Sequence, residues 1–533
     1  MHLQWLLVLA GVVAAQPHYV GDQACQTCHP AEARAFGRTG MARSMAVPNA
    51  NSAEFSRTVK VQGPSGVSYV STARNGRPFH ESVREGGAVE THEVVYAIGS
   101  GQHGRSYVVA RGDALFLSPV SYYSAKGAWD LSPGYAAGSF REFTRPVTAG
   151  CLFCHAGLPQ PVAGTTNRYR QPPFRALAIG CERCHGPGES HVKAPSAQTI
   201  VNPARLQGAA RDDVCDQCHL GGDIRILRPK KSELDFRPGL SLADVMAVFA
   251  VPPSAKPGRL DAVGQADQLR MSRCWKASQG RLGCITCHDP HAEPSGAQAA
   301  AYYRSRCLEC HETRPCIEQP MRRHATSPVD DCVSCHMPLS QLNRIAHIAH
   351  TNHRILRHKE DALDPSEAEA QGFDLIYQGR GQADSRSKAL AYAQAAQGLP
   401  VFSGQAQRLL GEVAKANPDD AEVAGALGLL LRDPNQAEPY LERAVALGSP
   451  SAEVKSALSE LLVGRGETER AVRLGREAVE SAPYDAAVSM ALARVYLQSG
   501  DRDSARALLN RVGSFDPANP ALTELLRKLG GAR

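Results

Sequence analysis

The order of apolar and polar positions changes character along the chain. Trp5 to Ala15 form an apolar run that ends in small residues before Gln16, which predicts a signal peptide. This run has 11 residues, too few to cross a bilayer easily, but the leading MHLQ lacks Lys or Arg, so an uncleaved anchor is the alternative interpretation. Between about residues 57 and 123, alternating stretches rich in Val, Tyr, Ser and Gly predict β-hairpins, with Asn75-Gly76 as a tight turn.

The C-terminal third has a helical period and an internal repeat. Beyond about residue 364, Ala and Leu dominate, and cysteine and histidine are absent after His358. Three alanines are spaced 34 residues apart, at Ala437, Ala471 and Ala505. Prolines recur at similar intervals, at Pro418, Pro450, Pro483 and Pro517. This period predicts tetratricopeptide repeats, and the alternative is an ordinary helical bundle.

The cysteines carry the strongest chemical signal. The chain has 16, and 14 of them form Cys-x-x-Cys pairs, each followed directly by His. The seven motifs are Cys25-Cys28-His29, Cys151-Cys154-His155, Cys181-Cys184-His185, Cys215-Cys218-His219, Cys284-Cys287-His288, Cys307-Cys310-His311 and Cys332-Cys335-His336. In an exported chain the default interpretation of cysteines is disulfides, but this spacing favours c-type haem attachment.

The chemistry of haem attachment explains the spacing. Two thiols add to the two vinyl groups of one haem, and the adjacent imidazole binds the iron from the proximal side. Zinc ribbons also use Cys-x-x-Cys pairs but do not need His after each one, and redox-active pairs occur once per thioredoxin-like domain. We therefore predict seven c-type haems with iron, whose 14 propionates would offset the formal charge of +6, so the charge gives no support for nucleic-acid binding.

Two cysteines lie outside the motifs, Cys274 and Cys316. Both fall inside the haem-binding region, and in an oxidising compartment they can form a disulfide. Two free thiols are the alternative.

Each iron also needs a ligand on its distal side, usually His and sometimes Met. The candidates are Met41, His103, His191, His291, His324, His347 and His353. His191 and His291 are too close in sequence to their own proximal histidines, so each would serve a neighbouring haem. Met45 is an alternative to Met41. We expect His80 and His92 to be surface residues of strands.

The patterns together predict five segments and a fold class. The segments are a signal peptide (1–15), a first haem segment (16–50), a β-rich insertion (51–145), a six-haem region (146–360) and a repeat domain (361–533). The expected fold is a haem-packed cytochrome c domain, mostly irregular with short helices, with an inserted small antiparallel β region, followed by an all-α tetratricopeptide-repeat solenoid.

Several stretches carry a family resemblance. They are IGSGQHGRSY (98–107), PVSYYS to CLFCHAG (119–157), GCERCHGPGESH (180–191), VNPARL (201–206), LGCITCHDPH (282–291), DDCVSCHMP (330–338) and HIAHTNHRI (347–355). The chain resembles bacterial multihaem (heptahaem) c-type cytochromes with C-terminal tetratricopeptide repeats, and its haem domain is similar to the tetrahaem cytochrome of nitrifiers.

The resemblance implies haem binding and electron transfer. It also implies that His191, His291, His347 and His353 are ligands. Where relatives often carry His, this chain has Gln265, so one haem would take Met271 or another His, or would stay open.

These observations predict an electron carrier of the periplasm or cell exterior. The repeats would dock a redox partner protein, and the cleaved protein would not be integral to the membrane. One alternative is a multihaem oxidoreductase acting on a small inorganic nitrogen or sulfur compound at a five-coordinate haem, so enzyme status stays open. Another is a repeat scaffold whose haem domain senses redox state.

Overall fold

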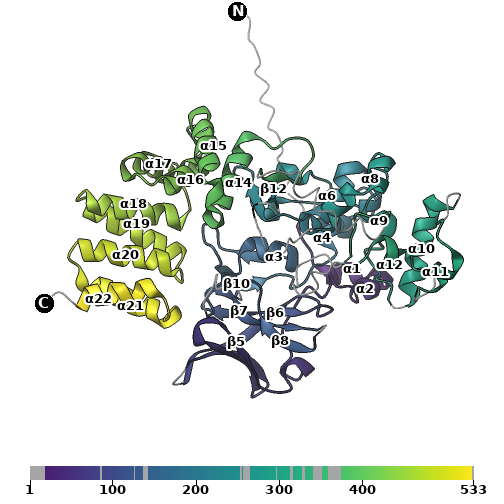
Figure 1. The fold of residues 1–533 in the computed structure, drawn as a ribbon, viewed down its shortest axis with the longest axis horizontal. Helices are drawn as coiled ribbons and strands as arrows, with labels where there is room; N and C mark the ends of the chain where they lie inside the picture. Colours follow the sequence, from purple (N-terminus) through teal and green to yellow (C-terminus); the bar gives the residue numbers. More distant parts are fainter. Residues whose placement is uncertain are drawn as a thin grey trace, which may run out of the picture.

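The computed structural model describes most of the chain. The described residues are 18–84, 87–124, 126–135, 142–252, 255, 264–295, 297–312, 316–326, 330–339, 351–357 and 374–530. The predicted signal peptide and His347 lie outside them. Figure 1 shows three parts: a helical array at one side, a β-sheet at the bottom and short helices at the other side.

The largest sheet has eight strands and is antiparallel throughout. Its strands are β1 (Met45–Ala46), β2 (Val59–Gln62), β3 (Ser68–Arg74), β4 (Arg77–Arg84), β5 (Gly87–Ile98), β6 (Arg105–Arg111), β7 (Ala114–Tyr123) and β8 (Ala128–Leu131). The order is β2-β3-β4-β5-β6-β7-β8, and β1 pairs with β5. The sheet curls strongly enough to bring β2, at one end of the strand order, into contact with β8 at the other end.

The predicted hairpins are confirmed, but the prediction of a small β region is wrong. Asn75 and Gly76 have positive φ and connect β3 to β4, as their sequence predicts. The sheet is large because eight strands pair with one another, and the longest of them, β5 with 12 residues, pairs with β1, β4 and β6. β1 also comes from the segment that holds the first motif, which ties that segment to the sheet.

The curled sheet encloses aromatic side chains and one histidine. Phe55, Tyr107 and Trp129 are buried there. His80 is fully buried against them, with ring centroids 5.1 Å from Trp129 and 5.3 Å from Tyr107. The expectation that His80 and His92 are surface residues is therefore wrong, since His92 also packs 4.6 Å from the Phe143 ring.

The region of the Cys-x-x-Cys-His motifs consists of short helices joined by irregular chain. These helices are α1 (Asp22–Gln26), α2 (Pro30–Phe36), α3 (Ala149–His155), α4 (Glu182–His185), α5 (Glu189–Lys193), α6 (Gly208–His219), α7 (Gln265–Met271), α8 (Arg273–Ser278), α9 (Cys284–Cys287), α10 (Ala297–His311), α11 (Pro320–His324) and α12 (Cys332–His336). Two small sheets accompany them, β9 (Pro159–Pro161) with β10 (Tyr169–Phe174), and β11 (Ile224–Leu227) with β12 (Met246–Ala250) and β13 (Ile376–Tyr377). Single 3₁₀ turns are η1 (Ala53–Phe55), η2 (Pro64–Gly66), η3 (Pro203–Arg205), η4 (Glu233–Asp235), η5 (Leu242–Asp244) and η8 (Pro400–Phe402).

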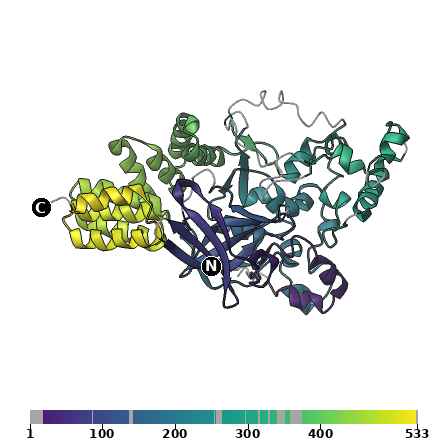
Figure 2. The same ribbon diagram turned by 60° about the horizontal axis from the view of Figure 1, so that its bottom comes forward.

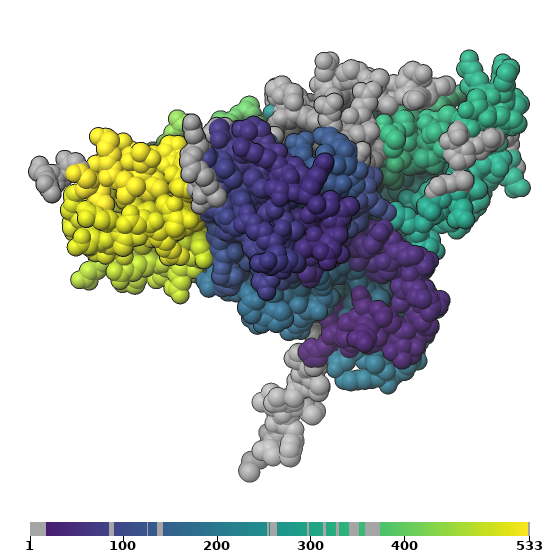
Figure 3. Space-filling model, turned by 90° about the horizontal axis from the view of Figure 1, so that it is seen from below, coloured from purple at the N-terminus to yellow at the C-terminus, as the bar shows by residue number. Residues whose placement is uncertain are grey.

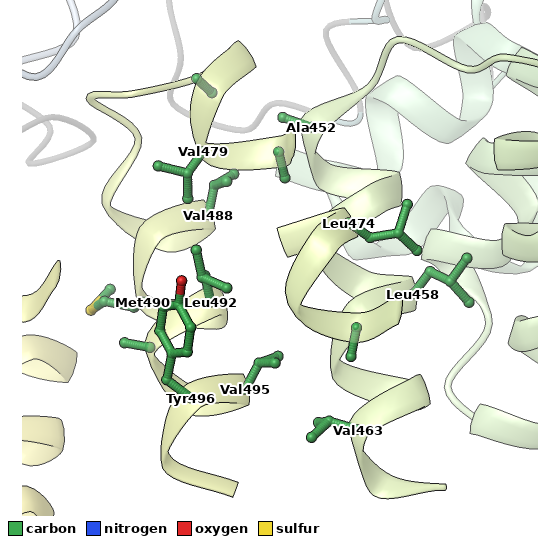
Figure 4. Close-up of a cluster of buried hydrophobic side chains, with 14 of the residues drawn as sticks. Ala452, Leu458, Val463, Leu474, Val479, Val488, Met490, Leu492, Val495 and Tyr496 are labelled. Atoms are coloured by element: carbon green, nitrogen blue, oxygen red, sulfur yellow. The ribbon is translucent and has the colours of Figure 1, made fainter. Parts of the chain in front are cut away.

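The C-terminal part is a row of antiparallel helix pairs. Its helices are α14 (Ser385–Gly398), α15 (Ser403–Ala416), α16 (Ala421–Leu430), α17 (Pro434–Ala446), α18 (Ala452–Gly464), α19 (Thr468–Ser481), α20 (Ala486–Gln498), α21 (Arg502–Phe515) and α22 (Pro520–Gly530). Figure 4 shows the apolar core between α18, α19 and α20. Gly475 lets two helices approach closely, because an added Cβ would lie 2.6 Å from Leu492.

The helical array contacts the rest of the molecule at two places. At its first helices, Leu390 and neighbouring residues of α14 share a core with Ile226 and Phe249 of the β11–β12 sheet. Near its other end, Tyr484 packs edge-on against Phe116 of β7, with ring centroids 5.8 Å apart. Figures 2 and 3 show the last repeats beside the large sheet. Within the described residues, no helix is long and apolar enough to cross a membrane.

Candidate functional site

Each motif folds as about one helical turn. The backbone N–H of the motif histidine donates to the carbonyl of the first cysteine, at 2.9 Å for His29, 3.0 Å for His185 and 3.0 Å for His288. In a helical turn, residues three apart lie on the same face. The two thiols of a motif therefore point to one side, as attachment to a single haem requires.

Three motif histidines face a second histidine from elsewhere in the chain. The ring centroids are 6.4 Å apart for His29 and His191, 5.9 Å for His185 and His291, and 6.2 Å for His288 and His353. The interplanar angles are 21°, 5° and 25°. Two imidazoles on opposite faces of one iron have centroids about 6 Å apart, from two metal–nitrogen bonds of about 2 Å and about 1 Å within each ring.

Backbone carbonyls fix the tautomer of several of these rings. The Nδ1–H groups of His185 and His336 donate to the carbonyls of Val201 and Leu356, at 2.8 and 2.7 Å. The Nδ1–H of His353 donates to the Thr351 carbonyl at 2.9 Å. A proton on Nδ1 leaves the Nε2 lone pair free for a metal.

Burial favours the neutral form of two of these rings. It lowers the pKa values of His185 and His353, which are both partly buried. A neutral imidazole is the form that binds a metal, so the sites are prepared for iron near neutral pH.

Two motif histidines have side-chain partners at Nδ1 instead. The His219 Nδ1 lies 3.4 Å from Gln265 Oε1, and the His288 Nδ1 lies 3.3 Å from the Tyr303 hydroxyl. Gln265 is thus beside Nδ1 of His219, away from the Nε2 that would bind iron. The sequence singled out Gln265 as a missing distal ligand; its contact is to a proximal histidine.

The remaining candidate ligands are placed as follows. His191, on α5, faces His29. Met41 lies in the turn between α2 and β1. His324, at the end of α11, pairs with no proximal ring among the described residues. His103 lies in the turn between β5 and β6, where its carbonyl accepts from the Ser124 N–H at 3.0 Å. Nowhere in the described ranges do three or more His, Cys, Asp or Glu side chains converge as around a metal ion.

Cysteines of different motifs contact one another. Four pairs of thiols from different motifs lie beside each other: Cys25 and Cys181, Cys154 and Cys218, Cys215 and Cys284, and Cys307 and Cys332. In each pair, the neighbouring thiol raises the pKa of one member and lowers that of the other. Each thiol would mark the edge of one bound haem, so these contacts would bring the attachment points of neighbouring haems together. The sequence contains no signal for this pairing.

The structure does not join Cys274 and Cys316, which are both free thiols. Cys274 is half-buried on α8, where the nearby Cys310 and burial raise its pKa, with burial the larger cause. Cys316 is exposed between α10 and α11.

Comparison with known proteins identifies two regions. The tetratricopeptide repeat family matches residues 462–529. The C-terminal region is a tetratricopeptide-repeat array. The doubled CXXCH motif family matches residues 277–315, which include the fifth and sixth motifs and imply c-type haems. The donor set fits that group, because the thiol pairs, the facing imidazoles and the neutral rings are those that a c-type haem needs.

Solved structures similar to the chain align with about a quarter of it. The MamA protein is 22% identical over 27% of this chain and 80% of its own, with a TM-score of 0.24. Pseudomonas aeruginosa pilF is 21% identical over 27% and 68%, with a TM-score of 0.24. YrrB, described as a TPR protein with an unusual peptide-binding site, is 21% identical over 27% and 76%, with a TM-score of 0.23. No curated protein matches the chain.

Proposed function

We propose that the protein is an exported heptahaem c-type cytochrome that transfers electrons between partner proteins. The observation that carries this proposal is the set of contacts between cysteines of different motifs. Thiols in contact hold neighbouring haem edges close together, and close edges are what electron hopping requires. Export is expected because c-type haem motifs are typical of proteins outside the cytoplasm.

The contacts define an order that differs from the order in sequence. The first motif contacts the third through Cys25 and Cys181. The third motif lies near the fourth, because Cys184 is close enough to interact electrostatically with both Cys215 and Cys218. From Cys215 the path continues to the fifth motif.

The path has one branch and one further stretch. Cys154 of the second motif contacts Cys218 of the fourth, so the second motif forms a side branch. Beyond the fifth motif, Cys287 lies near Cys307 of the sixth, which contacts Cys332 of the seventh. The fourth motif is therefore the junction of the network.

The chain's own residues would hold each haem. The motif cysteines would bind it covalently, and the motif histidines would bind iron, with His191, His291 and His353 opposite His29, His185 and His288. His347, His103, His324 and Met41 are candidates for the other irons. The bound haem supplies a reversible one-electron iron couple. The hydrogen bonds at Nδ1 orient the rings so that the ligands need not move when the iron changes charge.

The repeats are proposed to dock a redox partner protein. Repeat arrays present extended surfaces to other proteins, and the contacts of this array with the rest of the described chain lie at its first helices and around Tyr484, Glu480 and Phe515. Removing residues 450–533 would keep α14, whose packing the β11–β12 sheet needs. We expect this truncation to slow electron transfer to the native partner while haem content stays the same; an unchanged rate would contradict a docking role.

Site-directed removal of single haems tests the electron path. A photoreductant attached to the exposed Cys316 would deliver electrons near the sixth motif. In a Cys215→Ser, Cys218→Ser variant, fast reduction should stop at the three haems of motifs five to seven. The matched variant Cys151→Ser, Cys154→Ser loses the side branch, so fast reduction should still reach the first motif.

Two further measurements test the number of haems and the alternative that the protein is an enzyme. Intact mass should show seven haems on the exported protein, and fewer would contradict the count. Carbon monoxide should leave the spectrum of the fully reduced protein unchanged if every iron is six-coordinate. A change equal to one haem would support catalysis at an open iron instead.

A further inference from the structure

A side chain, and not a backbone carbonyl, contacts Nδ1 of the fourth-motif histidine, as it also does at the fifth motif. Where a carbonyl accepts from Nδ1, as at His185 and His336, no side-chain substitution removes the acceptor. At His219 the partner is the amide of Gln265, at the start of α7. The junction of the cysteine network is therefore a site where a side chain contacts the proximal ring.

The local packing holds Gln265 in this position. Gly264, the N-cap of α7, lies against the chain just after His219, because an added Cβ there would be 2.6 Å from the His219 carbonyl oxygen and 2.2 Å from the Gly221 nitrogen. The Asp267 carboxylate accepts from the Gly221 N–H at 3.1 Å. Two separate contacts thus fasten the start of α7 to the residues that follow the fourth motif.

The chemistry fixes the direction of the hydrogen bond. If Nε2 binds iron, Nδ1 carries the proton and donates, so the oxygen of the Gln265 amide accepts. An acceptor at Nδ1 increases the basicity of the ring, and a more basic ring stabilises the oxidised iron more than the reduced iron.

We propose that Gln265 is a positioning residue that, through the Nδ1 of His219, lowers the reduction potential of the fourth haem and so sets the energy of the junction. This inference rests on the proposed haem binding at the fourth motif. It also gives Gln265 a role of its own, whereas the sequence comparison had treated it only as the place of a missing distal ligand.

The test compares two substitutions with opposite expected signs. Gln265→Met keeps the size of the side chain and removes the acceptor, so the potential of one haem should rise. Gln265→Glu provides a stronger acceptor, so the potential of the same haem should fall. We expect each to change the oxidised-to-reduced equilibrium about tenfold, which is about 59 mV for a one-electron couple. A redox titration of the complete holoprotein, followed by its haem absorbance, measures both shifts.

Gln207 provides the matched control. It precedes the same helix α6 that ends in His219, is exposed, and its side chain does not cap the helix. Gln207→Met and Gln207→Glu should leave every haem potential unchanged. The control thus shows whether a shift in the Gln265 variants comes from the hydrogen bond to His219 or from the added side chain or charge itself.

The outcomes separate this inference from the proposed function. Opposite shifts in one haem, with seven haems retained by intact mass, support it. Shifts of the same sign, no shift, or the loss of one haem from both Gln265 variants would overturn it while the cytochrome proposal stands. If the unmodified protein carries no haem at the fourth motif, the proposed function itself fails.

Discussion

The repeat array and the motif region differ in how many apolar side chains they bury. Between α18 and α20 the array buries Leu458, Leu474, Leu492 and Val495, all at most 4% exposed. Across the described residues from 264 to 357, the buried apolar side chains are Ala266, Ala300 and Leu356. A stretch this poor in buried apolar residues lacks a core of its own, so the proposed haems would have to provide one.

The largest predicted effect comes from withholding haem. Protein made without haem attachment should lack stable structure between residues 264 and 357, because apolar macrocycles would replace the missing core there. The array should remain folded on its own side chains. Hydrogen exchange followed by mass spectrometry should show fast exchange in α9, α10 and α12 and slow exchange in α18 to α20. Equal protection of both regions in the apoprotein would show that the comparison is mistaken.

The two regions also differ in how far the sequence predicts them. The spacing of Ala437, Ala471 and Ala505 predicts the array because each repeat packs on its neighbour, so a local period determines the contacts. The motif spacing predicts short helices because two cysteines three residues apart share one face of a helical turn. Which motifs meet depends on irregular chain between them, and nothing in the sequence near Cys25 indicates Cys181.

The large sheet shows a second limit of prediction from sequence. His80 and Ser82 alternate along β4 with Phe79 and Glu81, so a simple rule of apolar-inside places the polar pair outside. The structure buries both polar residues completely, and His80 Nδ1 lies 2.7 Å from the Ser118 hydroxyl. His80 can be buried because it has a hydrogen-bond partner 38 residues away in the chain, and the alternation alone cannot identify that partner.

A cavity in the array should have a smaller and local effect. Leu458→Ala should cost about 2–5 kcal/mol of array stability, because the fully buried side chain leaves a void. Urea unfolding followed by exchange in α18 to α20 measures it, with the haem spectrum unchanged. Glu460→Ala on the same helix removes only a half-exposed ion pair with Arg494, for which less than about 1 kcal/mol is expected. A similar cost for both would contradict a self-sufficient array core.

Acid should weaken the sheet before it weakens the array. Burial lowers the pKa of His80 to about 3, whereas the unfolded chain has an ordinary histidine. The unfolded state therefore binds more protons below about pH 6.5, so stability is full above that pH and falls as the pH drops towards 3, by up to about 1.4 kcal/mol per unit. Thermal unfolding from pH 7.5 to 4.5 should show this slope, and His80→Gln should flatten it. An unchanged slope in the variant would assign the acid sensitivity to other groups.

The smallest predicted effect concerns the contact that joins the two kinds of region. Tyr484 extends from the loop between α19 and α20 and meets Phe116 edge-on, so Tyr484→Ala should cost about 1–2 kcal/mol. Tyr484→Phe keeps the ring and is the matched control. If the array and the sheet are stabilised independently and this contact only joins them, the alanine variant should speed hydrogen exchange in β7 and in the α19–α20 loop but not in the core of α18. Faster exchange throughout the array would mean instead that the array core depends on its contact with the sheet. The array would then not be self-sufficient, and the contrast with the haem-dependent region would fail.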